Sequence, residues 1–405
     1  MKIPEKIKRQ QPAEHKKSTT AKSVNLTEYR KKKKQTKHVV RLLIAGIIIA
    51  AFAYVWVNAD TIFEPLRGIA SKIETKTSTE VGFPISLPGS AGYSFRRFGN
   101  NFSLLTDTYL YTYETSGAQI YALRHGYSNP VQVTGNRRIL LYDKAAYSFG
   151  LYNKTSLIYE KTLEDKILYG VLGENDMVGI VTGSSRYSNI LYVYDSGGNW
   201  KYTRKFADEN ITCAAFPGNS DSIIVATISV DSGEIVTNFY KFSLKSSEDW
   251  EWKYSFRGNS LPCGLYADSD KVISVCDNRV LALNASDGGF IGEYLYNGTL
   301  RDFTISENYT AIYYNDMSSN RNMLVSLDGA AQSVSAVQLS SNAQQLLLDG
   351  DTLYVLDGTS MKLFDIQTLG ISDTVQMKSD YSSFVKIDSE LFLLGYDVVD
   401  CERIN

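Results

Sequence analysis

Few side chains in this sequence occur in a spacing that could carry out a reaction. The chain has three histidines, and His15 and His38 both lie in a basic N-terminal segment. A Ser-His-Asp triad in the remainder could therefore use only His125. This residue stands in His-Gly-Tyr-Ser-Asn, a composition typical of a turn between strands. We expect a turn there and no catalytic residue.

Two pairs of acids could suggest metal ligands. They are Asp268 with Asp270 and Asp349 with Asp351, and carboxylate oxygens are ligands that Ca²⁺ accepts. Both pairs fall at the ends of expected strands, where aspartate favours turns. No GxGxxG, P-loop or EF-hand series occurs in the chain. We therefore expect neither a metal site nor a bound cofactor.

The four cysteines all follow residue 200. Cys213 and Cys263 each hold the third place of a similar segment, ITCAAF and LPCGLY. If these segments are neighbouring strands in the same register, the two thiols face one another. This gives the hypothesis of a Cys213–Cys263 disulfide, and the alternative is buried free cysteine acting as a small apolar side chain.

Two tryptophans, Trp250 and Trp252, flank Glu251. Exposed tryptophans are frequent anchors of protein interfaces. We take this segment as the candidate interaction surface, and packing of both side chains inside the fold is the alternative.

The segment that determines where these residues lie in the cell is Leu42–Val57, which is sixteen residues long and has no charge. Counted from Val39 it reaches 19 residues, enough to cross a bilayer as a helix. A buried core helix is the alternative, although such a helix seldom lacks a polar face over this length. The following residues offer no clear cleavage site for a signal peptide. We predict one uncleaved transmembrane signal anchor over residues 38–58.

Charge gives the orientation of this span. Residues 1–41 hold 14 Lys or Arg and 3 Asp or Glu, while the whole chain holds 42 and 44. Positive residues before a span indicate that this end stays in the cytoplasm. A lysine run can also indicate nucleic-acid binding, but beside a span we expect contact with anionic lipid and no nucleic-acid partner. The protein is thus predicted in the plasma membrane with its C-terminal part outside the cytoplasm.

The polar, lysine-rich residues 1–37 predict a disordered cytoplasmic tail. Residues 59–82 predict a juxtamembrane helix and linker. From residue 83 to 405 the pattern becomes short alternating runs rich in Tyr, Val, Ile and Thr, broken by Gly, Asn, Asp and Ser. This alternation is typical of β-strands.

The strands repeat. First strands are expected near eight residues spaced 37 to 50 apart: Tyr93, Pro130, Ile167, Ile211, Leu261, Leu300, Ala343 and Ser382. Five of the repeats contain an alternating strand closed by a polar turn with glycine, such as VLALNASDG at Val280–Gly288. Such a period suits a four-stranded propeller blade.

We therefore predict an all-β fold, a β-propeller of seven or eight four-stranded blades, with eight favoured. The last repeat has room for three strands, and Phe83–Leu87 could supply the fourth, which would close the ring and remove an exposed sheet edge. A solenoid or a sandwich would also give many short strands. The near-constant repeat with one internal order favours the propeller.

The third-strand pattern resembles that of propellers in the quinoprotein-dehydrogenase-like and WD40-like superfamilies. The chain more closely resembles an uncharacterised family of membrane-anchored propeller proteins of Gram-positive bacteria, a domain of unknown function. The segments that carry this resemblance are Gly82–Gly89, Leu104–Thr108, His125–Pro130 and Leu140–Asp143. The resemblance implies a fold and a location, and it brings no catalytic residues.

These observations predict a non-enzymatic protein of the bacterial cell envelope, in which the propeller serves as a protein-interaction scaffold or binding module. The alternative is a sensor or small-ligand receptor that uses the propeller channel. A degenerate quinoprotein-like enzyme comes third, because the adjacent cysteines and tryptophan docking motifs that this resemblance would require are missing from the sequence. The identity of a partner or ligand does not follow from the sequence.

Overall fold

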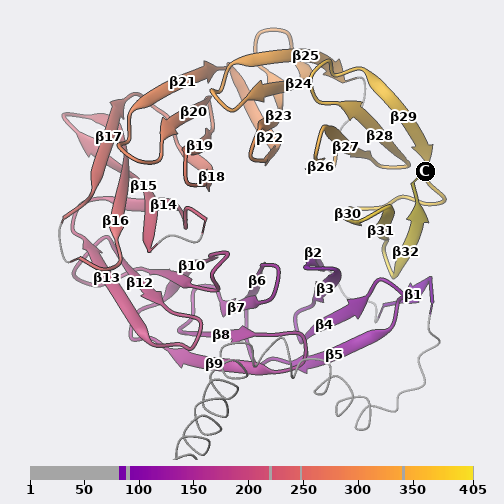
Figure 1. Ribbon diagram of the computed structural model, residues 1–405, viewed down its shortest axis with the longest axis horizontal. Coiled ribbons are helices and arrows are strands. Elements are labelled where there is room, and N and C mark those ends of the chain that lie inside the picture. The colour runs from indigo at the N-terminus through magenta and orange to yellow at the C-terminus, as the bar shows by residue number, and fades with distance from the viewer. Residues whose placement is uncertain (1–81, 88–91, 219–220, 247–248, 340–342, 405) are drawn as a thin grey trace, which may run out of the picture. The chain divides into compact units, whose positions relative to one another are not determined.

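The computed structural model describes residues 82–87, 92–218, 221–246, 249–339 and 343–404. These residues form eight four-stranded antiparallel sheets, which are arranged as blades around a central axis (Figure 1). The all-β propeller with eight blades is thus confirmed. The predicted tail (1–37), the membrane span (38–58) and all but Gly82 of the juxtamembrane helix and linker (59–82) lie outside the described residues. Within the described residues, no helix is both long and apolar enough to cross a membrane.

The blades follow one another in sequence, and each begins with its innermost strand. Blades 1 to 4 consist of β2(Ser94–Phe98), β3(Asn101–Leu105), β4(Tyr109–Glu114) and β5(Gln119–Arg124); β6(Pro130–Thr134), β7(Ile139–Asp143), β8(Ser148–Tyr152) and β9(Leu157–Thr162); β10(Ile167–Leu172), β11(Val178–Thr182), β12(Asn189–Tyr194) and β13(Trp200–Phe206); β14(Asn210–Ala215), β15(Ser222–Asp231), β16(Glu234–Ser243) and β17(Trp252–Arg257). Blades 5 to 7 consist of β18(Pro262–Ala267), β19(Lys271–Cys276), β20(Arg279–Asn284) and β21(Phe290–Leu295); β22(Gly298–Ile305), β23(Tyr309–Asp316), β24(Arg321–Asp328) and β25(Ser333–Leu339); β26(Gln345–Asp349), β27(Thr352–Asp357), β28(Ser360–Asp365) and β29(Ile371–Gln376).

The eighth blade is built from both ends of the described chain. Its inner strands are β30(Ser383–Ile387), β31(Glu390–Leu394) and β32(Val398–Arg403), and its outer strand is β1(Ile85–Ser86). Ile85 pairs with Val399 and Ser86 with Val398. The segment Phe83–Leu87 therefore supplies the missing outer strand, as the sequence predicted, and the N-terminal strand closes the ring against the last one.

The hydrophobic core is divided among the junctions between blades. In β7, Ile139 and Leu141 pack with blade 1, while Leu140 and Tyr142 pack with blade 3. Because successive side chains of a strand point to opposite faces, a blade between two others needs apolar residues on both. This explains why the middle strands read as nearly continuous apolar runs. Each of the eight junctions has such a cluster among the described residues.

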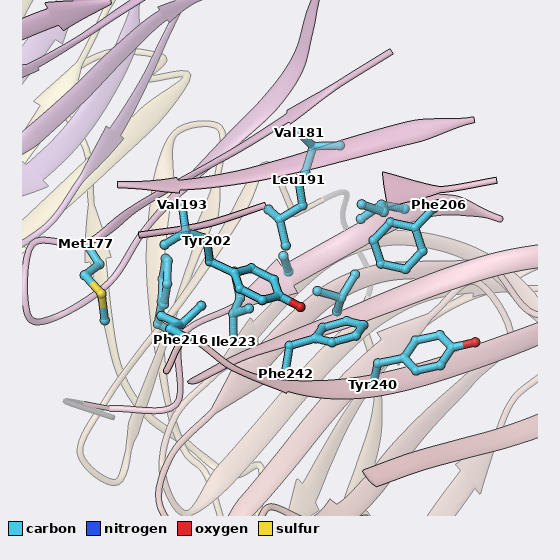
Figure 2. Close-up of a cluster of buried hydrophobic side chains, with 14 residues drawn as sticks. Met177, Val181, Leu191, Val193, Tyr202, Phe206, Phe216, Ile223, Tyr240 and Phe242 are labelled. Carbon is cyan, nitrogen blue, oxygen red and sulfur yellow. The ribbon is translucent and has the colours of Figure 1, made fainter. Parts of the chain in front are cut away.

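The junction of blades 3 and 4 illustrates the packing (Figure 2). Leu191, Val193 and Tyr202 of blade 3 lie against Ile223 and the aromatic residues of blade 4. The rings of Tyr202 and Phe242 have their centroids 6.2 Å apart. Contacts of this kind bury the tyrosines that are so frequent in the sequence, and aromatic pairs stabilise a fold beyond the area that they bury.

Candidate functional site

The strand order gives the propeller two different faces. Antiparallel strands alternate in direction, so the turns after the first and third strands of every blade lie on one face, which we call the hairpin face. The turns after the second strand and the connections between blades lie on the other, the connection face. Every exposed side chain at a strand end can be assigned to one face in this way.

Exposed apolar side chains recur on the hairpin face where the outer strands begin. Each of six successive blades has at least one within two residues of the start of its outer strand. This set, which we call the rim row, consists of Leu157, Trp200, Trp250, Phe290, Ile291, Val334 and Ile371, with exposed fractions of 41 to 64%. Single exposed apolar residues are common on protein surfaces, but a repetition at one place in six blades in succession needs an explanation.

The two tryptophans of the predicted interaction surface have different surroundings. Trp250 belongs to the rim row, and its ring lies 5.6 Å from that of Tyr240. Trp252 is buried, so the prediction that it forms part of an interaction surface is wrong. Its indole Nε1 donates a hydrogen bond to the Ala285 carbonyl oxygen of blade 5, 3.0 Å away. The sequence could not separate the two residues, because Trp252 is the first residue of β17 and Trp250 still lies in the preceding loop.

The predicted disulfide is not formed, since the structure contains both cysteines as free thiols. Cys213 and Cys263 do lie on the inner strands of neighbouring blades, β14 and β18. Each strand has a β-bulge, but the extra residue is Thr212 in β14 and Cys263 in β18. The residue that corresponds to Cys263 is therefore Thr212 and not Cys213. A shift of one residue turns a side chain to the other face of a strand.

The environments of the two thiols follow from this offset. Cys263 is exposed, and its Sγ lies 3.3 Å from the Leu261 carbonyl oxygen. Cys213 packs into the cluster between blades 4 and 5, and its Sγ lies 3.5 Å from the Pro262 carbonyl oxygen. Burial raises the pKa of Cys213 to about 12, and it raises that of Cys276, in β19 of blade 5, to about 12. These two thiols stay protonated at neutral pH, and a protonated thiol is a poor nucleophile.

His125 is a buried residue in the connection from blade 1 to blade 2. Its Nε2 lies 3.1 Å from the Thr106 carbonyl oxygen, and its Nδ1 lies 3.4 Å from the backbone nitrogen of Tyr127. Nε2 therefore donates and Nδ1 accepts, which describes a neutral ring. Burial lowers the pKa of His125, against the opposing effect of its bond to Thr106. The imidazole fixes this connection, in keeping with the predicted turn.

The paired acids belong to turns on the hairpin face. Asp268 Oδ1 accepts hydrogen bonds from the backbone N–H groups of Asp270 and Lys271, both at 2.8 Å. Asp349 Oδ2 lies 2.5 Å from the ammonium of Lys386, on the neighbouring blade. Among the residues that the structure describes, no three His, Cys, Asp or Glu side chains are grouped in a way that could hold a metal ion.

Two cavities lie where the eighth blade meets its neighbours, blades 7 and 1. The larger has a volume of about 410 Å³ and opens on the connection face. We call it the mouth cavity; it is lined by Gly92, Tyr93, Gln344, Asp380, Tyr381, Ser382, Leu394, Gly395 and Tyr396. The smaller, of about 180 Å³, lies between the inner strands β2, β26 and β30 and has Arg96 and Lys386 in its wall. Sequence reasoning missed both cavities, because their residues come from segments about 300 positions apart.

Comparison with known proteins places this propeller in a family. The model of a family of unknown function, DUF5711, matches residues 72–386. The chain belongs to this family. A comparison with curated proteins gives no match.

Solved structures agree on the fold. Saccharomyces cerevisiae Sqt1 is 10% identical with a TM-score of 0.59, and the match covers 80% of this chain and all of that one. The C-terminal WD40 domain of Sif2 is 8% identical with a TM-score of 0.57, over 81% of this chain and all of that domain. A eukaryotic initiation factor is 11% identical with a TM-score of 0.53, over 80% of this chain and 85% of that one. At these identities the likeness concerns the propeller fold alone, which hosts many functions.

Proposed function

We propose that this DUF5711 protein is a non-enzymatic scaffold of the bacterial cell envelope. In this proposal a single N-terminal span holds the propeller at the outer side of the plasma membrane, and the hairpin face binds a second envelope protein. The span and the basic residues before it in the sequence support the location. The rim row carries the proposal of binding, because each of six successive blades presents an apolar side chain at the same edge.

In blades 3 to 5, side-chain contacts between neighbouring blades support this edge. Arg204 of blade 3 lies 3.1 Å from Asp249, in the loop that also holds Trp250. Further along the same edge, the Tyr254 ring of blade 4 stacks on Phe290 of blade 5 at a centroid distance of 6.4 Å. These contacts hold the exposed rings in place before a partner arrives. Because these rings are already ordered, binding a partner costs little of their conformational entropy, which favours affinity.

The experiment is site-specific photo-crosslinking in intact cells. A photoreactive amino acid is placed at Trp200 or Phe290 on the rim row, and at Met317 as the control. Met317 is an apolar residue of 67% exposure on the connection face. Rim positions should capture one protein that Met317 does not capture, and Trp250→Ser should weaken this capture from Phe290. Equal capture at both faces, or none at the rim, would remove the proposal.

A receptor for a small ligand is the second candidate, and the mouth cavity favours it. Its volume of about 410 Å³ lies within the range of ligand pockets. Its lining combines three tyrosines with a carboxylate and an amide. Since this cavity opens on the connection face, ligand binding there and protein binding at the rim row do not exclude one another.

A further inference from the structure

The mouth cavity has one charged side chain among the described residues that line it, Asp380. This aspartate lies in the connection between blades 7 and 8 and is exposed. Its carboxylate has no hydrogen-bond or ion-pair partner among the residues that the structure describes. The basic residue nearest to it in sequence, Lys378, pairs instead with Glu402 at 2.6 Å. The cavity therefore presents a negative charge that no side chain of the described residues neutralises.

Aromatic rings complete the wall. Tyr381 is almost fully buried, and its hydroxyl donates to Asp400 Oδ2 at 2.5 Å, which fixes the ring in place. Tyr93 is half-buried, while Tyr396 is 90% exposed at the turn between β31 and β32. The electron-rich face of an aromatic ring attracts cations. The rings of Tyr93 and Tyr396 and the carboxylate of Asp380 thus favour the same sign of ligand charge, while the buried Tyr381 supports the wall.

We propose that the mouth cavity binds an organic cation through an alkylammonium group held between Asp380 and the rings of Tyr93 and Tyr396. An anionic ligand would be repelled by the unpaired carboxylate. A neutral ligand would remove water from this carboxylate without replacing the lost solvation, and an unpaired buried charge is costly. An ammonium compensates the charge, and the rings accommodate its carbon substituents.

The volume tells more about this ligand. A cavity of about 410 Å³ exceeds what an isolated ammonium head group fills, so there is room for the chain that carries it. The side-chain amide of Gln344 lies in the same wall and has no hydrogen-bond partner in the part of the chain that the structure describes, so it can bind a polar group of that ligand. The ammonium can belong to a small quaternary or primary amine or to a lysine side chain. This proposal does not depend on the rim row, and it gives the second candidate function its ligand class.

The test is calorimetric titration of the full-length protein with choline and with Nα-acetyl-lysinamide, and with 3,3-dimethylbutan-1-ol as the uncharged analogue of choline. We expect saturable binding of at least one ammonium compound below about 10 mM and none of the alcohol. Binding of choline alone would indicate a small quaternary amine as the source, and binding of the lysine derivative would indicate a protein side chain. No saturable binding of either, or equal binding of the alcohol, would overturn the proposal.

Matched variants locate the binding. Asp380→Asn removes the charge and should lower the affinity for the ammonium compound about tenfold or more. Asp208→Asn is the control, because Asp208 is an exposed aspartate in the corresponding connection between blades 3 and 4. Tyr396→Phe keeps an aromatic ring and should retain the affinity, whereas Tyr396→Ser should lower the affinity several-fold. If Asp208→Asn weakens binding as much as Asp380→Asn, the ligand is not held in the mouth cavity. Equal thermal unfolding of all variants serves to exclude an effect on the fold.

Discussion

The indole of Trp252 in blade 4 lies directly against the backbone of Gly288 in blade 5. A β-carbon at Gly288 would come within 2.6 Å of the Trp252 Cε3 atom. Gly288 has a φ of +72°, a conformation that glycine adopts without strain. The turn of one blade thus rests on the outer strand of the preceding blade, and glycine at that place allows both the turn and the contact.

The same arrangement recurs around the ring. A β-carbon at Gly198 of blade 3 would lie 2.7 Å from the Tyr159 ring of blade 2. A β-carbon at Gly117 of blade 1 would lie 2.7 Å from the carbonyl oxygen of Gly82, which precedes the closing strand β1. Three of the turn glycines that mark the repeat in the sequence, Gly117, Gly198 and Gly288, therefore also lie where neighbouring blades meet.

Removal of the indole at this junction should destabilise the propeller strongly. Trp252→Ala leaves a cavity beneath the turn of blade 5 and should lower the free energy of unfolding by about 3–5 kcal/mol. Trp250→Ala, two residues away and exposed, should cost less than about 1 kcal/mol. Urea titration followed by tyrosine and tryptophan fluorescence measures both changes. Equal losses in the two variants would contradict a structural role for Trp252 and a surface role for Trp250.

The start of the first strand of each blade could be predicted accurately from the sequence. Every one of the eight predicted first strands begins within two residues of the observed one, from Tyr93 against Ser94 to Ala343 against Gln345. Alternation and turn residues are local properties, so they can be recognised without knowledge of the neighbours. The predicted use of Phe83–Leu87 as an outer strand is also confirmed, because an open last blade would otherwise leave an unpaired edge.

The errors concern residues whose surroundings depend on distant segments. The one-residue offset between the bulges of β14 and β18 separates Cys213 from Cys263, and no local pattern reveals on which residue a bulge falls. The burial of Trp252 depends on Gly288, which belongs to the next blade. The mouth cavity draws together four separate segments, and single residues such as Tyr396 gave no signal of it.

A second prediction concerns the closure of the ring by β1. Ile85 is buried with 7% exposure and belongs to the cluster between blades 8 and 1, whereas Ser86, the next residue, is exposed. Ile85→Asp would place a charge in that cluster and should cost about 3 kcal/mol or more. Ser86→Asp, on the same strand, should stay within about 0.5 kcal/mol of the unmodified protein. Denaturant titration of the two variants compares them. If Ile85→Asp were as stable as Ser86→Asp, the ring would not need this strand.

A third prediction is a loss of stability in alkali. The pKa of Cys213 and that of Cys276 are each raised by burial to about 12, from an ordinary value near 9. The folded state therefore binds more protons than the unfolded state between these values, and stability is complete below about pH 9 and falls as the pH rises toward 12. Above about pH 9, each thiol should lower the free energy of unfolding by about 1.4 kcal/mol for each pH unit.

Denaturant titrations from about pH 8 to about pH 10.5 measure this slope. The double variant Cys213→Ala with Cys276→Ala should have a shallower slope than the unmodified protein. Val275→Ala serves as the control, because Val275 is a buried neighbour of Cys276 that does not titrate. This variant should be less stable at every pH with an unchanged slope. An equal slope in the double variant would show that the two thiols do not carry the effect.

The last prediction tests the proposed orientation in the membrane. Cysteine is introduced at Val230, which is 73% exposed near the turn between β15 and β16, or at Ser18 in the basic tail. Both variants carry Cys263→Ser, which removes the exposed native thiol. With the tail in the cytoplasm, a membrane-impermeant maleimide should label Val230→Cys in intact cells and Ser18→Cys only after permeabilisation. The reverse pattern would place the propeller in the cytoplasm and would rule out an envelope scaffold. Labelling of both sites in intact cells would mean that the tail does not remain inside, and the positive charges before the span would then not determine the topology.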